Sequence, residues 1–541
     1  MKQGAGDTAQ FGWYEAGLPL GERKQRGHFS TPPALVEQIL DACGYTSAAD
    51  LSHLRLLDPA CGSGNFLACA ARRLALSGQA HGLPASQIGK LVQRNIWGLD
   101  PDPVACLLAE MQVRVAVTAT CRVSSRAFQP HIHQADSLIL PWQPCVDLLV
   151  ANPPYLATKN NDLSHYSRAL QRGQADSYLL FLELALQVVR PGGWIGLVLP
   201  DPVLARANAA LERAHLLREC TLHHIWHLAG VFAAEVGAVV LVGQKLPPCS
   251  QHHIFWMRTR WHEQCSLYPA DRPDEQSQAV AQAILRGQPG AELRYLLNSG
   301  PGPGVERLRR ALYAQHGASH TTSRLLPLEQ LAEIRRGEEL GRRNPALLPL
   351  KALEDGYPVL RGGIDVRPYV RPASAWGIAR GAVRKPLEHY LAPKLLIVKS
   401  TERLQATLDL HGHVVLQTLY LLRLRPPHRH PDGYYFLLAL LNSRLLRDYV
   451  AYLHTTYKLV QPQIEQTVLA RLPIAWAESD VQQEIATRAR HLERACSETG
   501  PVVEWGEPLT SLYEEQERAI RALYAITVPE IFDDKGVIVY D

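Results

Sequence analysis

The sequence predicts an α/β protein with a doubly wound sheet, followed by a second domain of mixed α+β character. Strand-length and helix-length apolar segments alternate through the first 246 residues, and the alternation stops there. The chain has 541 residues, of which 46% are hydrophobic and 20% are charged. A chain of this length and composition is expected to form two or three globular domains.

Four apolar runs have the length of buried strands, and segments with helical periodicity separate them. The expected strands are Leu54–Leu57, Ile96–Leu99, Val146–Val150 and Trp194–Leu199. The expected helices are Phe66–Leu76, Pro103–Val117 and Ser177–Val189. Pro191-Gly192-Gly193 is expected to form a turn before the fourth strand. In such a sheet, ligands bind at the carboxyl ends of the strands.

A domain boundary near residue 246 is predicted from Pro247-Pro248 and from the turn-rich stretch that follows. We therefore expect a first domain over residues 1–246, a second over 247–480 and a charged helical tail over 481–541. The second domain is expected to contain strands at Lys394–Lys399 and Val414–Leu424 and an apolar helix at Tyr434–Tyr452.

The composition argues against several classes of protein. Ten scattered cysteines without a CxxC pair predict reduced, mostly buried thiols, with neither a disulfide framework nor a metal site. We find no run of about 18 apolar residues, so we expect a cytoplasmic protein without a membrane span. We also expect a monomer. The net charge of +4 allows an acidic polymer as partner without requiring one.

Residues 58–66 combine the end of a strand, a tight turn of small residues and the start of a helix. Gly62 and Gly64 allow a sharp turn and the close approach of a ligand. A general nucleotide-binding turn is the alternative, but the turn has neither a GxGxxG pattern nor a P-loop lysine, so neither a dinucleotide pyrophosphate cradle nor a P-loop fits. Asp100 ends the next strand and could accept both ribose hydroxyls, and Asp136 could accept from an adenine amino group.

The tetrad Asn152-Pro153-Pro154-Tyr155 directly follows the third expected strand. An aromatic amine such as adenine N6 is a poor nucleophile, because its lone pair is delocalised into the ring. Acceptance of its two N–H hydrogens by the Asn152 side chain and the Pro153 carbonyl would free that lone pair, at roughly 3–4 kcal/mol per group. Tyr155 would stack on the base, which must first be flipped out of the duplex.

Thr31-Pro32-Pro33, the turn at 58–66, the two acids and the tetrad, in this order, resemble the gamma-class, Taq-type adenine-N6 DNA methyltransferases. The resemblance implies a Rossmann-like domain with a mixed seven-stranded sheet that binds S-adenosylmethionine, followed by a C-terminal target-recognition domain. It implies cofactor contacts for ten residues: Thr31, Asp58, Ala60, Gly62, Gly64, Phe66, Asp100, Asp136, Ser137 and Asn152.

The resemblance also implies that Phe232 packs against the target base opposite Tyr155. It places three further residues in the pocket: Asp176, Tyr178 and Phe181. The family often has Phe or Leu where this chain has Ser137. The apolar clamp on the cofactor adenine is therefore expected from Leu138 or Pro154.

A band of arginines with little accompanying acid crosses the second half of the chain. Four members are predicted to contact DNA: Arg335, Arg336, Arg361 and Arg367. Arginines suit phosphate neutralisation and guanine reading, so double-stranded DNA is the expected partner. Leu360–Ile364, Leu441–Ser443 and Arg471–Ile474 are similar to segments of Taq-type and Type I specificity domains.

Three alternatives stay open at this stage. The tetrad also suits RNA adenine or a protein glutamine amide, because both present the same delocalised nitrogen. The chain could be the methylase subunit of a larger defence complex, or it could work with a restriction endonuclease on a separate chain. A non-catalytic DNA-binding subunit is the third alternative. We expect the modification enzyme of a restriction–modification or phage-defence system.

Overall fold

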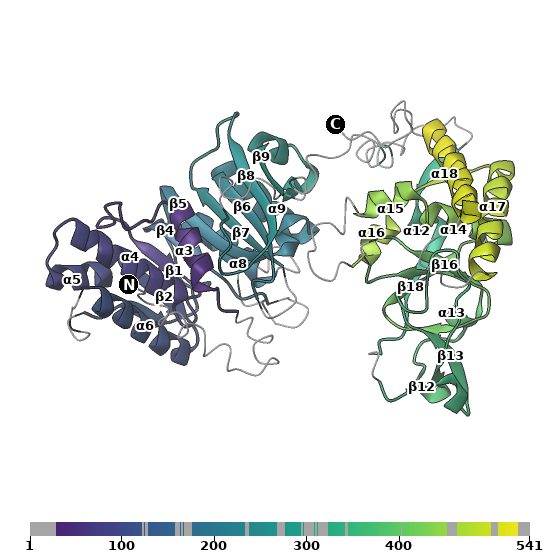
Figure 1. Ribbon diagram of the computed structural model, residues 1–541, viewed down its shortest axis with the longest axis horizontal. Coiled ribbons are helices and arrows are strands. Elements are labelled where there is room, and N and C mark those ends of the chain that lie inside the picture. The colour runs from purple at the N-terminus through teal and green to yellow at the C-terminus, as the bar shows by residue number, and fades with distance from the viewer. Residues whose placement is uncertain are drawn as a thin grey trace. The chain divides into compact units, whose positions relative to one another are not determined.

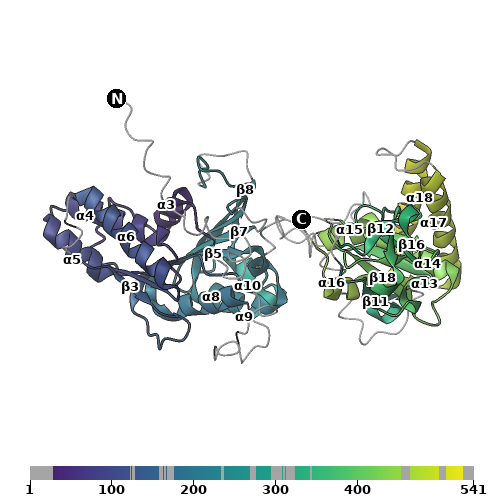
Figure 2. The same ribbon diagram turned by 90° about the horizontal axis from the view of Figure 1, so that it is seen from below.

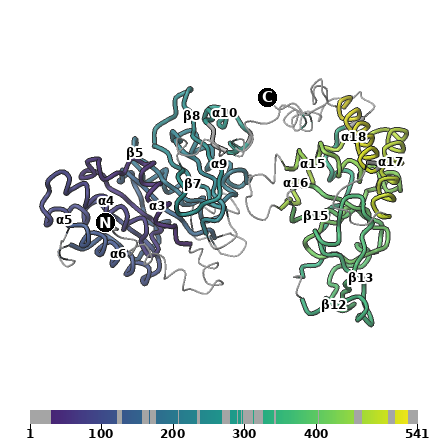
Figure 3. Tube along the Cα trace, viewed as in Figure 1, coloured from purple at the N-terminus to yellow at the C-terminus, as the bar shows by residue number. Residues whose placement is uncertain are grey.

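The computed structural model divides the chain into two compact units, Met1–Leu297 and Asn298–Asp541 (Figure 1). It describes residues 29–121, 124, 128–156, 163, 166, 176–232, 237–267, 276–293, 296, 308, 311, 323–340, 344–401, 403–451, 463–498 and 507–527. Figure 3 traces the first unit in purple to teal and the second in green to yellow. Each unit has a hydrophobic core of its own.

The first unit is built on a nine-stranded mixed sheet with the order β3-β2-β1-β4-β5-β7-β6-β8-β9. Its strands are β1 Leu56–Asp58, β2 Ile96–Asp100, β3 His131–Gln134, β4 Val146–Ala151, β5 Val189–Pro200, β6 Thr221–Ala229, β7 Ala238–Gln244, β8 His253–Arg260 and β9 Gln276–Ala281. β3, β2, β1, β4 and β5 are parallel, whereas β7 runs antiparallel to both of its neighbours.

Helices cover both faces of this sheet. They are α3 Pro33–Ala42, α4 Asn65–Ala80, α5 Ala85–Asn95, α6 Pro103–Cys121, α8 Ser177–Val188, α9 Ala210–Glu219 and α10 Gln282–Arg286. From β1 the chain passes to β2, which lies on one side of it in the sheet. From β4 it passes to β5, which lies on the opposite side. Right-handed connections therefore place α4 and α8 on opposite faces (Figure 2). The order reverses between β1 and β4, and this switch point is where a doubly wound sheet binds its ligand.

The predicted α/β class and the predicted strands and helices of the first unit are confirmed, but three details differ. The sheet has nine strands instead of seven, because β8 pairs in parallel with β6 and β9 pairs with β8. For the same reason the predicted boundary at 246/247 is wrong: Pro247-Pro248 belongs to the connection between β7 and β8. The predicted Pro191-Gly192-Gly193 turn lies inside β5, where the register to β4 shifts between Val189 and Trp194.

Among the described residues, one helix is long and apolar enough to cross a membrane by length and composition. This helix is α6, which has 19 residues and contains an 18-residue window with a mean hydropathy of 1.4. An ion pair of 2.7 Å between Glu110 and Arg114 interrupts its apolar residues. The helix packs against α4, and Val113 and Val117 contribute to the core. α6 is therefore part of the helical layer of this unit.

The second unit contains three small sheets, with the orders β10-β19, β11-β18-β15-β16 and β12-β14-β13-β17. Its strands are β10 Ser323–Pro327, β11 Ala332–Arg336, β12 Leu347–Pro349, β13 Gly356–Leu360, β14 Trp376–Ala379, β15 Lys394–Val398, β16 Ala406–Asp409, β17 Val414–Val415, β18 Leu419–Leu424 and β19 Pro473–Ala477. Its helices are α12 Leu328–Leu331, α13 Glu388–Leu391, α14 Pro431–Leu441, α15 Arg444–Val450, α16 Gln466–Ala470, α17 Ser479–Glu498 and α18 Glu507–Thr527.

The helical character predicted for the C-terminal tail is confirmed, but α17 and α18 form no separate tail. Both helices contribute buried residues to the main core of the second unit, among them Ile485 and Tyr524. The predicted helix Tyr434–Tyr452 is divided into α14 and α15, since the Ser443 hydroxyl accepts from Leu446 N–H at 3.3 Å and begins a new helix.

Candidate active site and cofactor cavity

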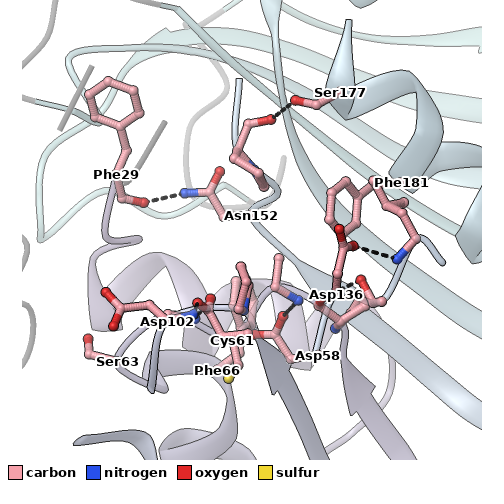
Figure 4. Close-up of a pocket in the computed structure, with 18 of the residues that line it drawn as sticks. Phe29, Asp58, Cys61, Ser63, Phe66, Asp102, Asp136, Asn152, Ser177 and Phe181 are labelled. Carbon is pink, nitrogen blue, oxygen red and sulfur yellow. Dashed lines mark hydrogen bonds between the residues drawn. The ribbon is translucent and has the colours of Figure 1, made fainter. Parts of the chain in front are cut away.

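A cavity of about 550 Å³ opens where β1, β2 and β4 end (Figure 4). The structure brings the ten predicted cofactor residues together around it: Thr31, Asp58, Ala60, Gly62, Gly64, Phe66, Asp100, Asp136, Ser137 and Asn152. They lie at the switch point of the sheet, where the topology leaves room for a ligand. Their role as cofactor contacts stays a prediction.

The turn below the cavity has a backbone conformation and a close packing that require glycine. Gly64 has a φ of +95°, and a Cβ there would lie 2.7 Å from the Ala109 Cα on α6. Asp100 holds this turn, because its Oδ2 accepts from Gly62 N–H and its Oδ1 from Asp102 N–H, each at 2.9 Å. Asp100 therefore shapes the cavity in addition to its predicted contact with a ribose.

Asp58 lies almost entirely buried at the end of β1, with 1% of its surface exposed. Burial raises the pKa of the Asp58 carboxyl to about 8, and the nearby Asp100 adds to the rise. A hydrogen bond from Ala60 N–H, at 3.1 Å, opposes the shift without cancelling it. A cation placed in the cavity would favour the charged form of Asp58.

Two buried polar atoms of the lining have no hydrogen-bond partner in the described part of the chain: Thr31 Oγ1 and Asn65 Oδ1. The Asn65 amide donates to Ser30 Oγ and to the Thr31 carbonyl, both at 2.8 Å, which fixes the orientation of Asn65 Oδ1. An orphaned hydroxyl, an orphaned acceptor and a buried carboxyl fit the carboxylate and ammonium groups of an amino-acid moiety. The cavity thus fits the methionine part of S-adenosylmethionine. Sequence reasoning missed Asn65, although it is a polar residue directly after the glycine turn.

Asn152 follows β4, and its amide has a defined orientation. The Asn152 Nδ2 donates to the Phe29 carbonyl at 2.5 Å, as the dashed line in Figure 4 shows. An amide that donates through nitrogen on one side presents its oxygen on the other. Asn152 Oδ1 is thereby oriented as an acceptor. No sequence signal pointed to this role of the Phe29 carbonyl, because the two residues are 123 positions apart.

Ser177 at the start of α8 fixes the backbone after the tetrad. Its hydroxyl donates to the Pro154 carbonyl and accepts from Leu156 N–H at 2.9 Å. The Ser177 N–H also donates to the Leu156 carbonyl at 2.9 Å. Within the described residues, no hydrogen bond occupies the Pro153 carbonyl. Pro153 is not among the residues that line the cavity, and its role as the second acceptor stays a prediction.

Three aromatic rings meet beside Asn152. The ring centroids of Phe29 and Tyr155 are 6.1 Å apart, those of Phe29 and Phe232 are 5.5 Å apart, and those of Tyr155 and Phe232 are 6.3 Å apart. The Tyr155 hydroxyl donates to the Val198 carbonyl at 3.3 Å, and burial raises the pKa of Tyr155. The rings of Tyr155 and Phe232, which the resemblance placed around the target base, thus lie close together. Phe29 contributes a third ring, which the sequence did not predict at this place.

The structure separates the three residues that the resemblance added to the pocket. Phe181 lines the cavity, whereas Tyr178 is buried outside the lining. Asp176 forms an ion pair of 2.8 Å with Arg206 and is not a lining residue either. Leu138 and Pro154, the two residues expected to provide an apolar clamp, both line the cavity.

The four arginines predicted to contact DNA lie in the second unit and differ in their exposure and in their contacts within the domain. Arg335, Arg336 and Arg367 are exposed, and Arg335 forms an ion pair with Glu333 at 3.3 Å. Arg361 pairs with Asp365 at 3.1 Å, lies 5.0 Å from the centre of the Trp376 ring, and has a side chain only 17% exposed. Arg361 is therefore engaged within the domain, which favours a structural role for it.

Two domain families match the chain, one in each unit. Residues 19–259 match the family described as N-6 DNA Methylase, and residues 354–474 match the TaqI-like C-terminal specificity domain. The first match covers a little under half of the chain, so residues 19–259 form a domain similar to the N-6 DNA Methylase family. This finding confirms the resemblance predicted from the motifs. Within the described residues, no group of three or more His, Cys, Asp or Glu side chains is placed to hold a metal ion.

The chain has relatives that are named as a Type II methyltransferase and as the methylase subunit of a Type I restriction enzyme. It is 29% identical over 209 residues to the Type II methyltransferase M.XhoI of Xanthomonas vasicola, a match that covers 37% of this chain and 38% of that protein. It is 28% identical over 187 residues to the Type I restriction enzyme EcoEI methylase subunit of Escherichia coli, covering 34% and 36%. The chain thus matches well under half the length of these curated relatives.

Two solved complexes with DNA share the fold of this chain. The Type IIL enzyme MmeI in complex with DNA has a TM-score of 0.57 at 12% identity, covering 95% of this chain and 78% of that one. The DrdV–DNA complex has a TM-score of 0.55 at 12% identity, covering 91% and 60%. At such identities the likeness shows the fold, and it agrees with the predicted architecture.

Proposed function

We propose that the protein is a site-specific DNA methyltransferase that transfers the methyl group of S-adenosylmethionine to N6 of an adenine flipped out of double-stranded DNA. The observation that carries the proposal is the orientation of the Asn152 amide, which donates to the Phe29 carbonyl and so presents its oxygen as an acceptor. The match of residues 19–259 to the N-6 DNA Methylase family supports the choice of adenine N6.

The cavity residues would hold the cofactor through complementary charges and hydrogen bonds. Asp58 and Asn65 would accept from the ammonium group, and Thr31 would donate to the carboxylate. Asp100 would accept from the ribose and Asp136 from the adenine amino group. The bound cofactor supplies an electrophilic methyl group on a sulfonium that leaves as a neutral thioether.

We expect binding of S-adenosylhomocysteine at pH 7 to release a proton from Asp58. Its pKa of about 8 leaves most of the buried carboxyl protonated at that pH, and the ligand ammonium favours the carboxylate. Affinity should therefore rise as the pH approaches 8. Calorimetric titrations in buffers with different ionisation enthalpies measure the release, and Asp58→Asn is the control that should abolish it. Identical binding enthalpies in all buffers would contradict the prediction.

The tetrad would activate the target nitrogen by accepting its hydrogens. Asn152 Oδ1 and the Pro153 carbonyl would each accept one N–H of the amine, which frees the lone pair for attack on the methyl carbon. The proton would leave once positive charge has developed on the nitrogen, so a strong base is unnecessary. The rings of Phe29, Tyr155 and Phe232 would hold the flipped base by stacking.

The second unit would select the DNA sequence. Its match to a specificity domain and the exposed Arg335, Arg336 and Arg367 support DNA as the partner, in preference to RNA or a protein amide. Because the relatives are named as Type II methyltransferases or as a Type I methylase subunit, we propose a role in restriction–modification in the cytoplasm. A restriction endonuclease or other subunits on separate chains would complete such a system.

Single-molecule sequencing of DNA from cells that express the protein tests this proposal. We expect N6-methyladenine within one short sequence context, and none in cells that express Asn152→Ala to the same level. Methylation of cytosine N4 would overturn the choice of adenine. Unmodified DNA from cells that contain the folded protein would overturn the choice of DNA.

A further inference from the structure

Tyr166 lines the cavity next to Asp136, and neither the sequence motifs nor the family resemblance assigned it a role. Its hydroxyl donates to Asp136 Oδ2 at 2.6 Å. Its ring packs against a small apolar cluster formed by Leu163 and Leu180, which also contacts Leu138. Burial, together with the hydrogen bond to Asp136, raises the pKa of Tyr166, so the hydroxyl keeps its proton and stays a donor.

Asp136 is held through both of its carboxylate oxygens. Oδ1 accepts from Leu138 N–H at 2.9 Å, and Oδ2 accepts from the Tyr166 hydroxyl. These two bonds fix the rotation of the carboxylate about its own axis. A carboxylate oxygen has more than one acceptor position, so Oδ2 can still accept a second hydrogen from a ligand.

Ser137 adds no apolar side chain to the cavity where the family often has Phe or Leu. Tyr166 and its neighbours provide apolar surface there. The Ser137 side chain is buried and turned away from any clamping role, because its hydroxyl donates to the Pro59 carbonyl at 2.7 Å. Leu138, Leu163 and Tyr166 instead supply apolar surface to the lining. A planar heteroaromatic ring is the group that this combination of flat apolar surface and a fixed carboxylate suits.

We propose that Tyr166 positions the adenine end of the cofactor: its hydroxyl fixes the Asp136 carboxylate to accept from the adenine 6-amino group, and its ring forms part of the clamp. This inference rests on S-adenosylmethionine being the cofactor. Tyr166 acts through Asp136, so its effect depends on the 6-amino group of the ligand. A residue that only maintained the fold would affect all ligands alike.

Calorimetric titration of Tyr166→Phe with two ligands tests this dependence. One ligand is S-adenosylhomocysteine, and the other is its analogue with hydrogen in place of the 6-amino group. We expect the variant to bind S-adenosylhomocysteine about tenfold more weakly, the effect of one hydrogen bond to a charged group. Binding of the analogue should change less than about twofold, because it has no amino group for Asp136 to accept from.

Tyr45→Phe is the matched control, since the Tyr45 hydroxyl is buried in the same unit and has no hydrogen-bond partner among the residues that the structure describes. It should leave both affinities unchanged. Equal weakening of both ligands by Tyr166→Phe would overturn the inference in favour of a structural role. Tighter binding of S-adenosylhomocysteine would also overturn it, because the hydroxyl would then compete with the amino group. A wild-type protein that binds neither ligand would instead refute the proposed cofactor.

Discussion

The Asn152→Ala variant should transfer methyl groups to DNA about 10²- to 10³-fold more slowly than the wild-type protein, the cost of removing one preorganised acceptor of this kind. The loss is expected in kcat, because Asn152 Oδ1 gains strength as an acceptor only when charge develops on the target nitrogen. Single-turnover transfer of tritium from labelled cofactor to DNA measures the effect. Retention of the wild-type rate within about tenfold would refute the assigned chemistry.

Two controls separate this chemistry from a loss of structure. Binding of S-adenosylhomocysteine to Asn152→Ala should stay within about threefold of the wild-type affinity, because most of the cavity lining is unchanged. Asn95→Ala is the matched variant: Asn95 is also buried in the first unit, and its amide donates to the Ser52 carbonyl at 2.8 Å. This variant should lose stability but keep its rate of transfer.

The chemistry of the site could be predicted from contiguous motifs, because the residues concerned are neighbours in the chain. The turn at 58–66 and the tetrad each occupy one strand end, and parallel strands bring those ends together. Phe29, Asn65 and Tyr166 could not be assigned in this way. Each acts through a partner that is 30 or more positions away, and tertiary structure alone brings the two partners together.

Non-local pairing also explains the errors in domain organisation. Pro247-Pro248 has the composition of a linker between domains. The chain nevertheless returns to the same sheet after it, because β8 pairs with the open edge of β6. In the same way, a sequence does not distinguish an arginine that reaches DNA from one that is paired within its domain. Arg361 illustrates this, although Asp365, four positions later, was a signal that could have been read.

Asp409→Asn is expected to destabilise the second unit by about 3–5 kcal/mol, the cost of leaving a buried charge without its partner. Asp409 is fully buried and accepts from Lys394 Nζ at 2.6 Å and from the His413 ring at 3.0 Å. The N–H groups of His411, Gly412 and His413 also donate to it. The amide of the variant would leave Lys394 buried and uncompensated. Urea unfolding at pH 7 measures the loss.

The pH dependence of unfolding provides an independent check. Burial alone would raise the pKa of Asp409, but the hydrogen bond from His413 and the charge of Lys394 hold it well below its usual range. The stabilisation is therefore present above the unfolded pKa of about 3.9 and is lost as the pH falls towards the folded value. Asp409→Asn should lack this component of the acid dependence.

The double variant Lys394→Met with Asp409→Leu should recover much of the stability, because an apolar pair removes both buried charges. If the double variant is no more stable than Asp409→Asn, the loss comes from the turn that Asp409 caps and not from the unpaired lysine.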